Sequence, residues 1–170
     1  MSRDRYLATY LNDHLAGATV GAELARRAAG SNKAGRYGPA LKELAEEIAE
    51  DRETLIKLMA DVGVGRDRIK VAAAWSAEKI GRLKPNGHLT SYSPLSRLEE
   101  LEILSLGVEG KLSMWRALRD AHGPSFGGAD LEHLIERGTH QRQRLEELHR
   151  DASRDALAGT SPRAGKSGAG

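Results

Sequence analysis

Near the C-terminal end of the sequence, a glutamate and a histidine stand three residues apart, as Glu146-x-x-His149. On a helix this spacing presents a carboxylate and an imidazole to one metal ion. Glu102 should approach them from another helix, so a metal-binding interpretation assigns Glu102, Glu146 and His149, with His14 or Glu109 as a further ligand. The preferred interpretation is a buried His149 that is hydrogen-bonded to Glu102 and binds no metal. His14 also falls on an inward helix face and then belongs to the same buried polar network.

Two arginines interrupt the apolar faces of their predicted helices, each close to the middle of its helix. Helical periodicity points Arg52 and Arg142 inward and places Glu109 at the same level of a third helix. Small residues of the first helix leave volume at this level: Gly17, Ala18 and Gly21. Because an unpaired buried charge is very costly, we predict a buried Arg52–Glu109–Arg142 cluster, which Glu109→Gln should destabilise markedly. In the alternative, both arginines extend past the apolar edge to water.

Basic residues gather between the second and third predicted helices. They are Arg66, Arg68, Lys70, Lys79, Arg82 and Lys84. Such a run could bind the phosphates of a nucleic acid, but we prefer to interpret it as the solvated face of a short amphipathic helix. The whole chain has 26 basic and 24 acidic residues and a net charge of only +2, so it lacks the strong positive field of most nucleic-acid-binding proteins. Nucleic acid is therefore not an expected partner.

Long helices must position these residues, because apolar residues recur at helical intervals along the 170-residue chain and no convincing alternating stretch occurs. Start and stop signals predict four helices, over residues 3–29, 38–62, 94–121 and 131–158. About thirty residues between the second and third are too many for a structureless connection, so a short extra helix is predicted over 67–82. The sequence thus predicts an all-α domain over 1–158, in which a crossover at about 64–93 joins two helical hairpins. A flexible tail follows over 159–170.

One side of the third predicted helix is apolar although it faces away from the bundle. Its residues are Ile103, Leu106, Gly107, Gly110 and Met114. Such a face needs a cover, which either the extra helix of the crossover supplies through Trp75 and Ile80, or a second subunit supplies. We favour cover by the crossover, with a homodimer through these five residues as the alternative.

The sequence also bounds the cellular setting. It contains no cysteine, which excludes disulfides, thiol nucleophiles and cysteine-ligated zinc or iron–sulfur sites. Residues 1–6 are charged and lead into no long apolar run, so neither a signal peptide nor a transmembrane segment is expected. We expect a cytoplasmic protein without a membrane partner.

Two segments, Tyr10–Gly17 and Ser91–Glu102, together with the paired helices and long crossover, resemble uncharacterised bacterial members of the ferritin-like superfamily. The resemblance spans about residues 3–155 and implies a ferritin-like four-helix bundle. Metal-dependent members carry a glutamate on the first and third helices and Glu-x-x-His on the second and fourth. Here the first helix has no inward carboxylate and the second has Glu50-Asp51-Arg52-Glu53 without a histidine, so the resemblance implies a degenerate di-metal site.

These observations predict a non-catalytic binding or interaction protein whose metal centre is replaced by buried Arg, Glu and His pairs. No cofactor is expected. The alternative is an atypical metal-binding protein that holds iron or manganese. If such a protein were an enzyme, it would be a metal-dependent oxidoreductase of the ferritin-like type.

Overall fold

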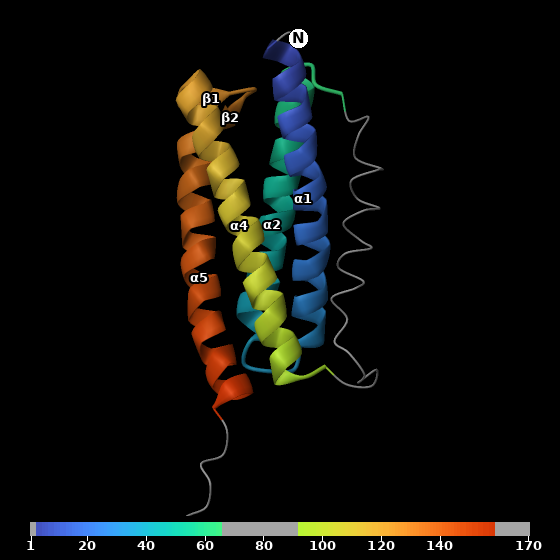
Figure 1. Cartoon of the computed structure of the whole chain (residues 1–170), viewed down its shortest axis with the longest axis vertical. Coiled ribbons are helices and arrows are strands. Elements are labelled where there is room, and N and C mark those ends of the chain that lie inside the picture. Colours follow the sequence, from blue (N-terminus) through green and yellow to red (C-terminus); the bar gives the residue numbers. More distant parts are fainter. Residues whose placement is uncertain (1–2, 66–91, 159–170) are drawn as a thin grey trace, which may run out of the picture.

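The computed structural model describes residues 3–65 and 92–158 of the chain (Figure 1). The elements within them are α1 (Arg3–Ser31), α2 (Gly38–Asp61), α4 (Pro94–His122), β1 (Ser125–Phe126), β2 (Ala129–Asp130) and α5 (Leu131–Leu157). The described chain is thus almost entirely helical, which confirms the predicted all-α class. Each helix begins and ends within two residues of its predicted bounds. The extra helix predicted over 67–82 and the tail predicted over 159–170 lie outside the described residues.

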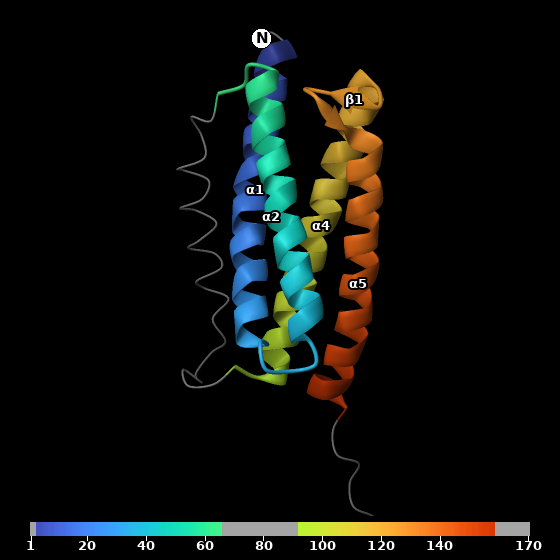
Figure 2. The ribbon, with the colours of Figure 1, turned by 180° about the vertical axis from the view of Figure 1, so that it is seen from behind.

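The helices form two antiparallel pairs, α1 with α2 and α4 with α5 (Figures 1 and 2). Helix α2 ends and α4 begins at opposite ends of the bundle, so these two helices run in the same direction. Between α4 and α5 the chain makes a small antiparallel hairpin, in which Ser125 pairs with Asp130 and Phe126 with Ala129. This hairpin was not predicted from the sequence.

Local signals at the helix ends explain where the helices begin. The Ser93 hydroxyl accepts a hydrogen bond from the Ser96 backbone N–H (3.1 Å), and Pro94 occupies the first turn of α4. The Asp130 carboxylate accepts one from the His133 N–H (3.1 Å) at the start of α5. Gly38 opens α2 where a Cβ atom would lie 2.8 Å from the carbonyl oxygen of Asn32, so only glycine fits.

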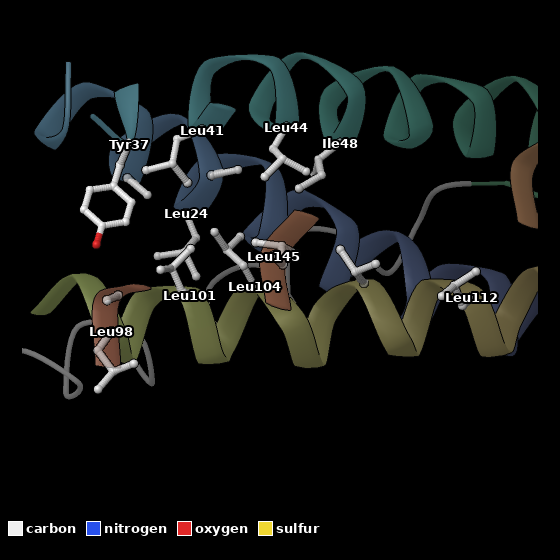
Figure 3. Close-up of a cluster of buried hydrophobic side chains, with 14 residues drawn as sticks. Leu24, Tyr37, Leu41, Leu44, Ile48, Leu98, Leu101, Leu104, Leu112 and Leu145 are labelled. Carbon is white, nitrogen blue, oxygen red and sulfur yellow. The ribbon is translucent and has the colours of Figure 1, made fainter. Parts of the chain in front are cut away.

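The core consists of two groups of buried side chains. One lies near the α1–α2 turn and includes Tyr37. In it, Leu24, Leu41 and Leu101 come from three different helices (Figure 3). The other lies near the opposite end and surrounds Trp115, which is fully buried. Aliphatic side chains dominate both groups, since the whole sequence contains only one Phe, four Tyr and two Trp.

Helix α1 holds both ends of the undescribed crossover. Near its start, the Asn12 amide donates to the carbonyl oxygen of Gly65, the last described residue before the crossover (3.0 Å). Near its end, the Asn32 amide donates to the Tyr92 hydroxyl (2.7 Å), which donates in turn to Glu100 (2.9 Å). Burial raises the pKa of Tyr92 to about 12, so this hydroxyl keeps its proton. The segments Tyr10–Gly17 and Ser91–Glu102 therefore contain residues that anchor the crossover.

Asn32→Ala is expected to lower the free energy of unfolding by about 1–3 kcal/mol. Asn32 is buried, and the change removes the donor to Tyr92 together with the oxygen that accepts from Arg97 Nε (2.6 Å). Urea unfolding followed by circular dichroism measures the loss. The neighbouring exposed Ser31→Ala serves as the control, with an expected change of less than about 0.5 kcal/mol. Equal unfolding midpoints for the two variants would contradict the proposed anchoring role.

Candidate functional site

A cavity of about 410 Å³ lies between α1, α2 and α4, near the middle of these helices, and it opens to the surface, because the exposed residues Gly17, Leu106 and Gly107 belong to its wall. We call it the α1–α4 cavity. Most of its wall is aliphatic, with Ile48 and Leu55 from α2 facing the residues of α1 and α4. Four glycines also line it: Gly17, Gly21, Gly107 and Gly110. All five residues of the apolar α4 face that was predicted to need a cover belong to this wall.

The cavity exists because α1 carries small side chains at this level. Between Ala16 and Leu24, no residue of α1 is buried. A Cβ atom added at any of the four glycines would meet no described atom within 4 Å. Gly17, Ala18 and Gly21 therefore leave open volume, as predicted, although the predicted arginine cluster does not fill it.

Two long-range contacts fix how α1 and α4 are aligned. Arg27 pairs with Glu100 (2.9 Å), and Arg97 donates to Asn32 (2.6 Å). Because α1 and α4 run antiparallel with 1.5 Å rise per residue, these contacts place Gly21 at the level of Gly107. The same alignment places Gly17 at the level of Gly110, and His14 at the level of Met114 and Trp115. The glycines of the two helices thus lie opposite each other.

Polar groups occupy a few places in the wall. Burial lowers the pKa of His14 below its ordinary value, against the opposing charge of Asp13, so the imidazole is neutral at pH 7. Trp115 is fully buried, and its indole N–H has no acceptor among the described residues. Arg52 Nε donates to the Thr19 hydroxyl (3.1 Å), and its guanidinium pairs with Glu53. An apolar cavity with few polar groups is typical of a site for a small organic ligand.

Protonation of His14 is expected to lower the free energy of unfolding of the wild-type protein as the pH drops below about 6.5. The pKa of His14 is lowered in the folded state, so the unfolded chain takes up this proton at a higher pH, and protonation favours unfolding. The effect ends once folded His14 is itself protonated. Urea unfolding between pH 7 and pH 5 measures it. In the His14→Gln variant, the free energy of unfolding should depend less on pH over this range. If it fell equally with pH in the wild type and the variant, His14 would not be the cause.

A cluster of buried charged and polar side chains adjoins the cavity. Its members are Asp51, Lys111, Arg137 and Gln141, which we call the Asp51 cluster. Asp51, only 2% exposed, accepts hydrogen bonds from Lys111, from Arg137 and from the Gln141 amide (3.0 Å). Lys111 also donates to the Gln141 side-chain oxygen. Burial lowers the pKa of Lys111, which the nearby Asp51 carboxylate partly opposes.

The structure corrects the predicted Arg52–Glu109–Arg142 cluster. Arg142 and Glu109 do form an ion pair, but it lies on the surface, with side chains 45% and 43% exposed. Arg52 does not join them, because it pairs with Glu53 and Thr19. The buried charge cluster predicted near the middle of the bundle is therefore present with different residues.

The spacing of the inward residues explains the difference. Alternating steps of three and four residues run through Leu44, Ile48, Asp51, Leu55 and Leu58 in α2, through Leu101, Leu104, Val108, Lys111, Trp115 and Leu118 in α4, and through Leu131, Leu134, Gly138, Gln141 and Leu145 in α5. Arg52 and Arg142 each follow such a position by one residue, which rotates them about 100° away. Strict counting of these steps is the sequence signal that could have identified the Asp51 cluster.

The predicted contact between His149 and Glu102 forms, at 3.2 Å between Nε2 and Oε1. It lies on a partly exposed groove between α4 and α5, which Glu146 also lines, so the prediction that this pair is buried is wrong. His14 lies in the α1–α4 cavity and is no part of this groove. The described residues contain no group of three or more His, Asp or Glu side chains that could hold a metal ion.

The predicted homodimer face is only partly at the surface. Leu106 is 74% exposed and Gly107 is exposed, but Met114 is buried in the core around Trp115. Ile103 and Gly110 are half-buried. The proposed cover by Trp75 and Ile80 lies outside the described residues, and so do all six basic residues of the crossover.

None of the described helices combines the length and the apolar character needed to cross a membrane. Comparison of the chain with models of protein families, with curated proteins and with solved structures gives no match.

Proposed function

We propose that this protein is a non-catalytic, ferritin-like helical bundle that binds a small, largely apolar ligand in the α1–α4 cavity. The observation that carries this proposal is the cavity itself. Its volume of about 410 Å³ falls within the roughly 300–1,000 Å³ of ordinary ligand pockets, and its wall is mostly apolar with a few polar groups.

The glycines of the cavity support a binding role. Each glycine inside a helix costs about 0.5–1 kcal/mol relative to alanine. Packing does not require glycine at these four positions, because a Cβ atom would meet no described atom within 4 Å. Each glycine has the effect of leaving open volume between α1 and α4, at a cost in helix stability.

The arrangement of the helices supports the ferritin-like part of the proposal. Two antiparallel pairs, with α2 and α4 running in the same direction, match the connectivity of bundles with one long crossover (Figures 1 and 2). In the middle of the bundle, Lys111 and Arg137 are paired with Asp51. Two cations beside the same carboxylate oppose the binding of a metal cation there, which supports a non-catalytic role.

The metal-binding alternative rests on the His149–Glu102 contact, a pair of possible ligands that the described residues do not extend to a group of three. Titration of the purified protein with Fe(II) and Mn(II) tests it. Stoichiometric binding that His149→Ala abolishes would support a metal-binding function, and the absence of binding would eliminate it.

Titration with the neutral fluorophore N-phenyl-1-naphthylamine tests the proposed cavity. We expect one apolar probe molecule to bind per chain, with strongly increased fluorescence. Gly21→Leu should weaken binding at least tenfold, because the added side chain fills part of the cavity. Gly30→Leu is the matched control, because Gly30 is an exposed residue of the same helix with open space around it but does not line the cavity. No binding, or equal binding by both variants, would overturn the proposal.

A further inference from the structure

Asp13 differs from the other charged residues that line the α1–α4 cavity. The others are Asp51, Arg52 and Lys111. Lys111 pairs with Asp51, and Arg52 pairs with Glu53. In the part of the chain that the structure describes, the Asp13 side chain forms neither an ion pair nor a hydrogen bond. Asp13 is therefore the charged residue of the wall that is still free to pair with a ligand.

Asp13 lies where the cavity meets a second hollow on the bundle surface. This hollow lies between the start of α1 and the end of α4, and its wall includes Tyr6, Tyr10 and Leu118. Asp13 is exposed and lines both hollows. Burial lowers the pKa of His14 in the cavity wall, and the charge of Asp13 opposes this shift. The carboxylate is thus accessible to solvent and close enough to act on a group of the cavity wall.

Tyrosine rings stand near this carboxylate. The Tyr10 ring packs edge-to-face against His14, with 4.5 Å between the ring centroids, and Tyr6 is 61% exposed. Burial raises the pKa of Tyr10, so its hydroxyl is uncharged at neutral pH. A cation is attracted both to a carboxylate and to the electron-rich face of a tyrosine ring. The surroundings of Asp13 therefore favour a positively charged group.

The interior of the cavity favours an uncharged body. Its wall extends along α1 from Asp13 to Leu24, about 16 Å at 1.5 Å per residue. The charges of the Asp51 cluster compensate one another, because its second cation, Arg137, also pairs with Glu50 (3.4 Å). A charge inside the cavity would therefore find no free partner, which is costly. The ligand charge belongs at the exposed position beside Asp13, where water still hydrates part of it.

Resting on the proposed function, we propose that the ligand is a hydrophobic amine, which is a cation at neutral pH. Its apolar body occupies the α1–α4 cavity. Its ammonium group lies at the exposed edge of the cavity and pairs with the Asp13 carboxylate.

Displacement of N-phenyl-1-naphthylamine by decylammonium, 1-decanol and decanoate at about pH 7.5 tests the charge of the ligand. The three compounds carry the same hydrocarbon chain, and His14 is neutral at this pH. We expect decylammonium to displace the probe at a concentration about threefold to fivefold lower than decanoate, the effect of a partly exposed ion pair. This difference should shrink as the salt concentration rises from about 20 mM to about 500 mM. Equal potency of the two ions, or a stronger effect of decanoate, would overturn the inference.

Asp13→Asn assigns the preference to one carboxylate. It should raise the decylammonium concentration needed for displacement about threefold to fivefold, and change that of 1-decanol by less than about twofold. Glu23→Gln is the matched control, because it removes the same charge from an exposed residue of α1 that lines neither hollow. An unchanged response to decylammonium in Asp13→Asn, or an equal loss in both variants, would contradict pairing with Asp13.

The same titrations separate this inference from the proposed function. If Gly21→Leu weakens binding of the probe but decylammonium does not displace the probe from the wild type, the cavity is a binding site and the amine is the wrong ligand. If the probe does not bind, or binds equally to Gly21→Leu and Gly30→Leu, the proposed function itself is overturned.

Discussion

Asp51→Asn is expected to lower the free energy of unfolding by about 3 kcal/mol or more, the largest effect of any single substitution considered for this protein. The carboxylate is almost completely buried and accepts hydrogen bonds from Lys111, Arg137 and Gln141. The neutral amide leaves the largely buried Lys111 without its paired carboxylate, while Arg137 keeps only the exposed carboxylate of Glu50 (3.4 Å). Urea unfolding measures the effect as a lower midpoint, with an unchanged dependence of the free energy on urea concentration.

Glu109→Gln provides the matched comparison for Asp51→Asn. It makes the same chemical change at the surface pair of Glu109 with Arg142, where both partners are nearly half exposed. Exposed ion pairs contribute about 0–1 kcal/mol, so the unfolding midpoint should hardly move. Destabilisation by Glu109→Gln that equals or exceeds that by Asp51→Asn would show that the Asp51 cluster is not the main buried charge centre.

The helices and their ends could be predicted from the sequence because their signals are local. Ser93 and Asp130 cap α4 and α5 through groups three residues away, so a short window contains the whole interaction. The apolar spacing within each helix is equally local. Which side chains meet between the helices depends on how each helix is rotated about its own axis. An error of one residue in that rotation places Arg52 in the core where the structure has Asp51.

The cavity could be predicted only in parts. The sequence shows the small residues of α1, which predict free volume. It also shows the apolar face of α4, which predicts a cover. That they enclose the same space follows from the alignment of α1 with α4. The contacts that set this alignment, Arg27 with Glu100 and Asn32 with Arg97, join residues 73 and 65 positions apart. No local pattern in the sequence pairs such residues.

Replacing all four cavity glycines with alanine is expected to stabilise the protein while weakening ligand binding. Each change gains about 0.5–1 kcal/mol of helix stability, and the four together about 2–4 kcal/mol if their effects add. None of the new methyl groups meets a described atom within 4 Å. The midpoint temperature of thermal unfolding should therefore rise by roughly 5–15 °C. Because the methyl groups occupy the space between α1 and α4, affinity for N-phenyl-1-naphthylamine should fall at the same time.

Gly138→Ala is the control that distinguishes the effect of helix propensity from the effect of open space around the glycine. It makes the same change inside α5, but the new Cβ atom would lie 2.8 Å from a methyl carbon of the buried Leu112. Overpacking of this kind costs about 1–3 kcal/mol, which cancels or exceeds the gain in helix propensity. The expected pattern is thus a gain in stability with a loss of binding for the four cavity glycines, and neither for Gly138. If the quadruple variant gained stability and bound the probe as tightly as the wild type, the glycines would not be there for a ligand, and the probe would be bound elsewhere.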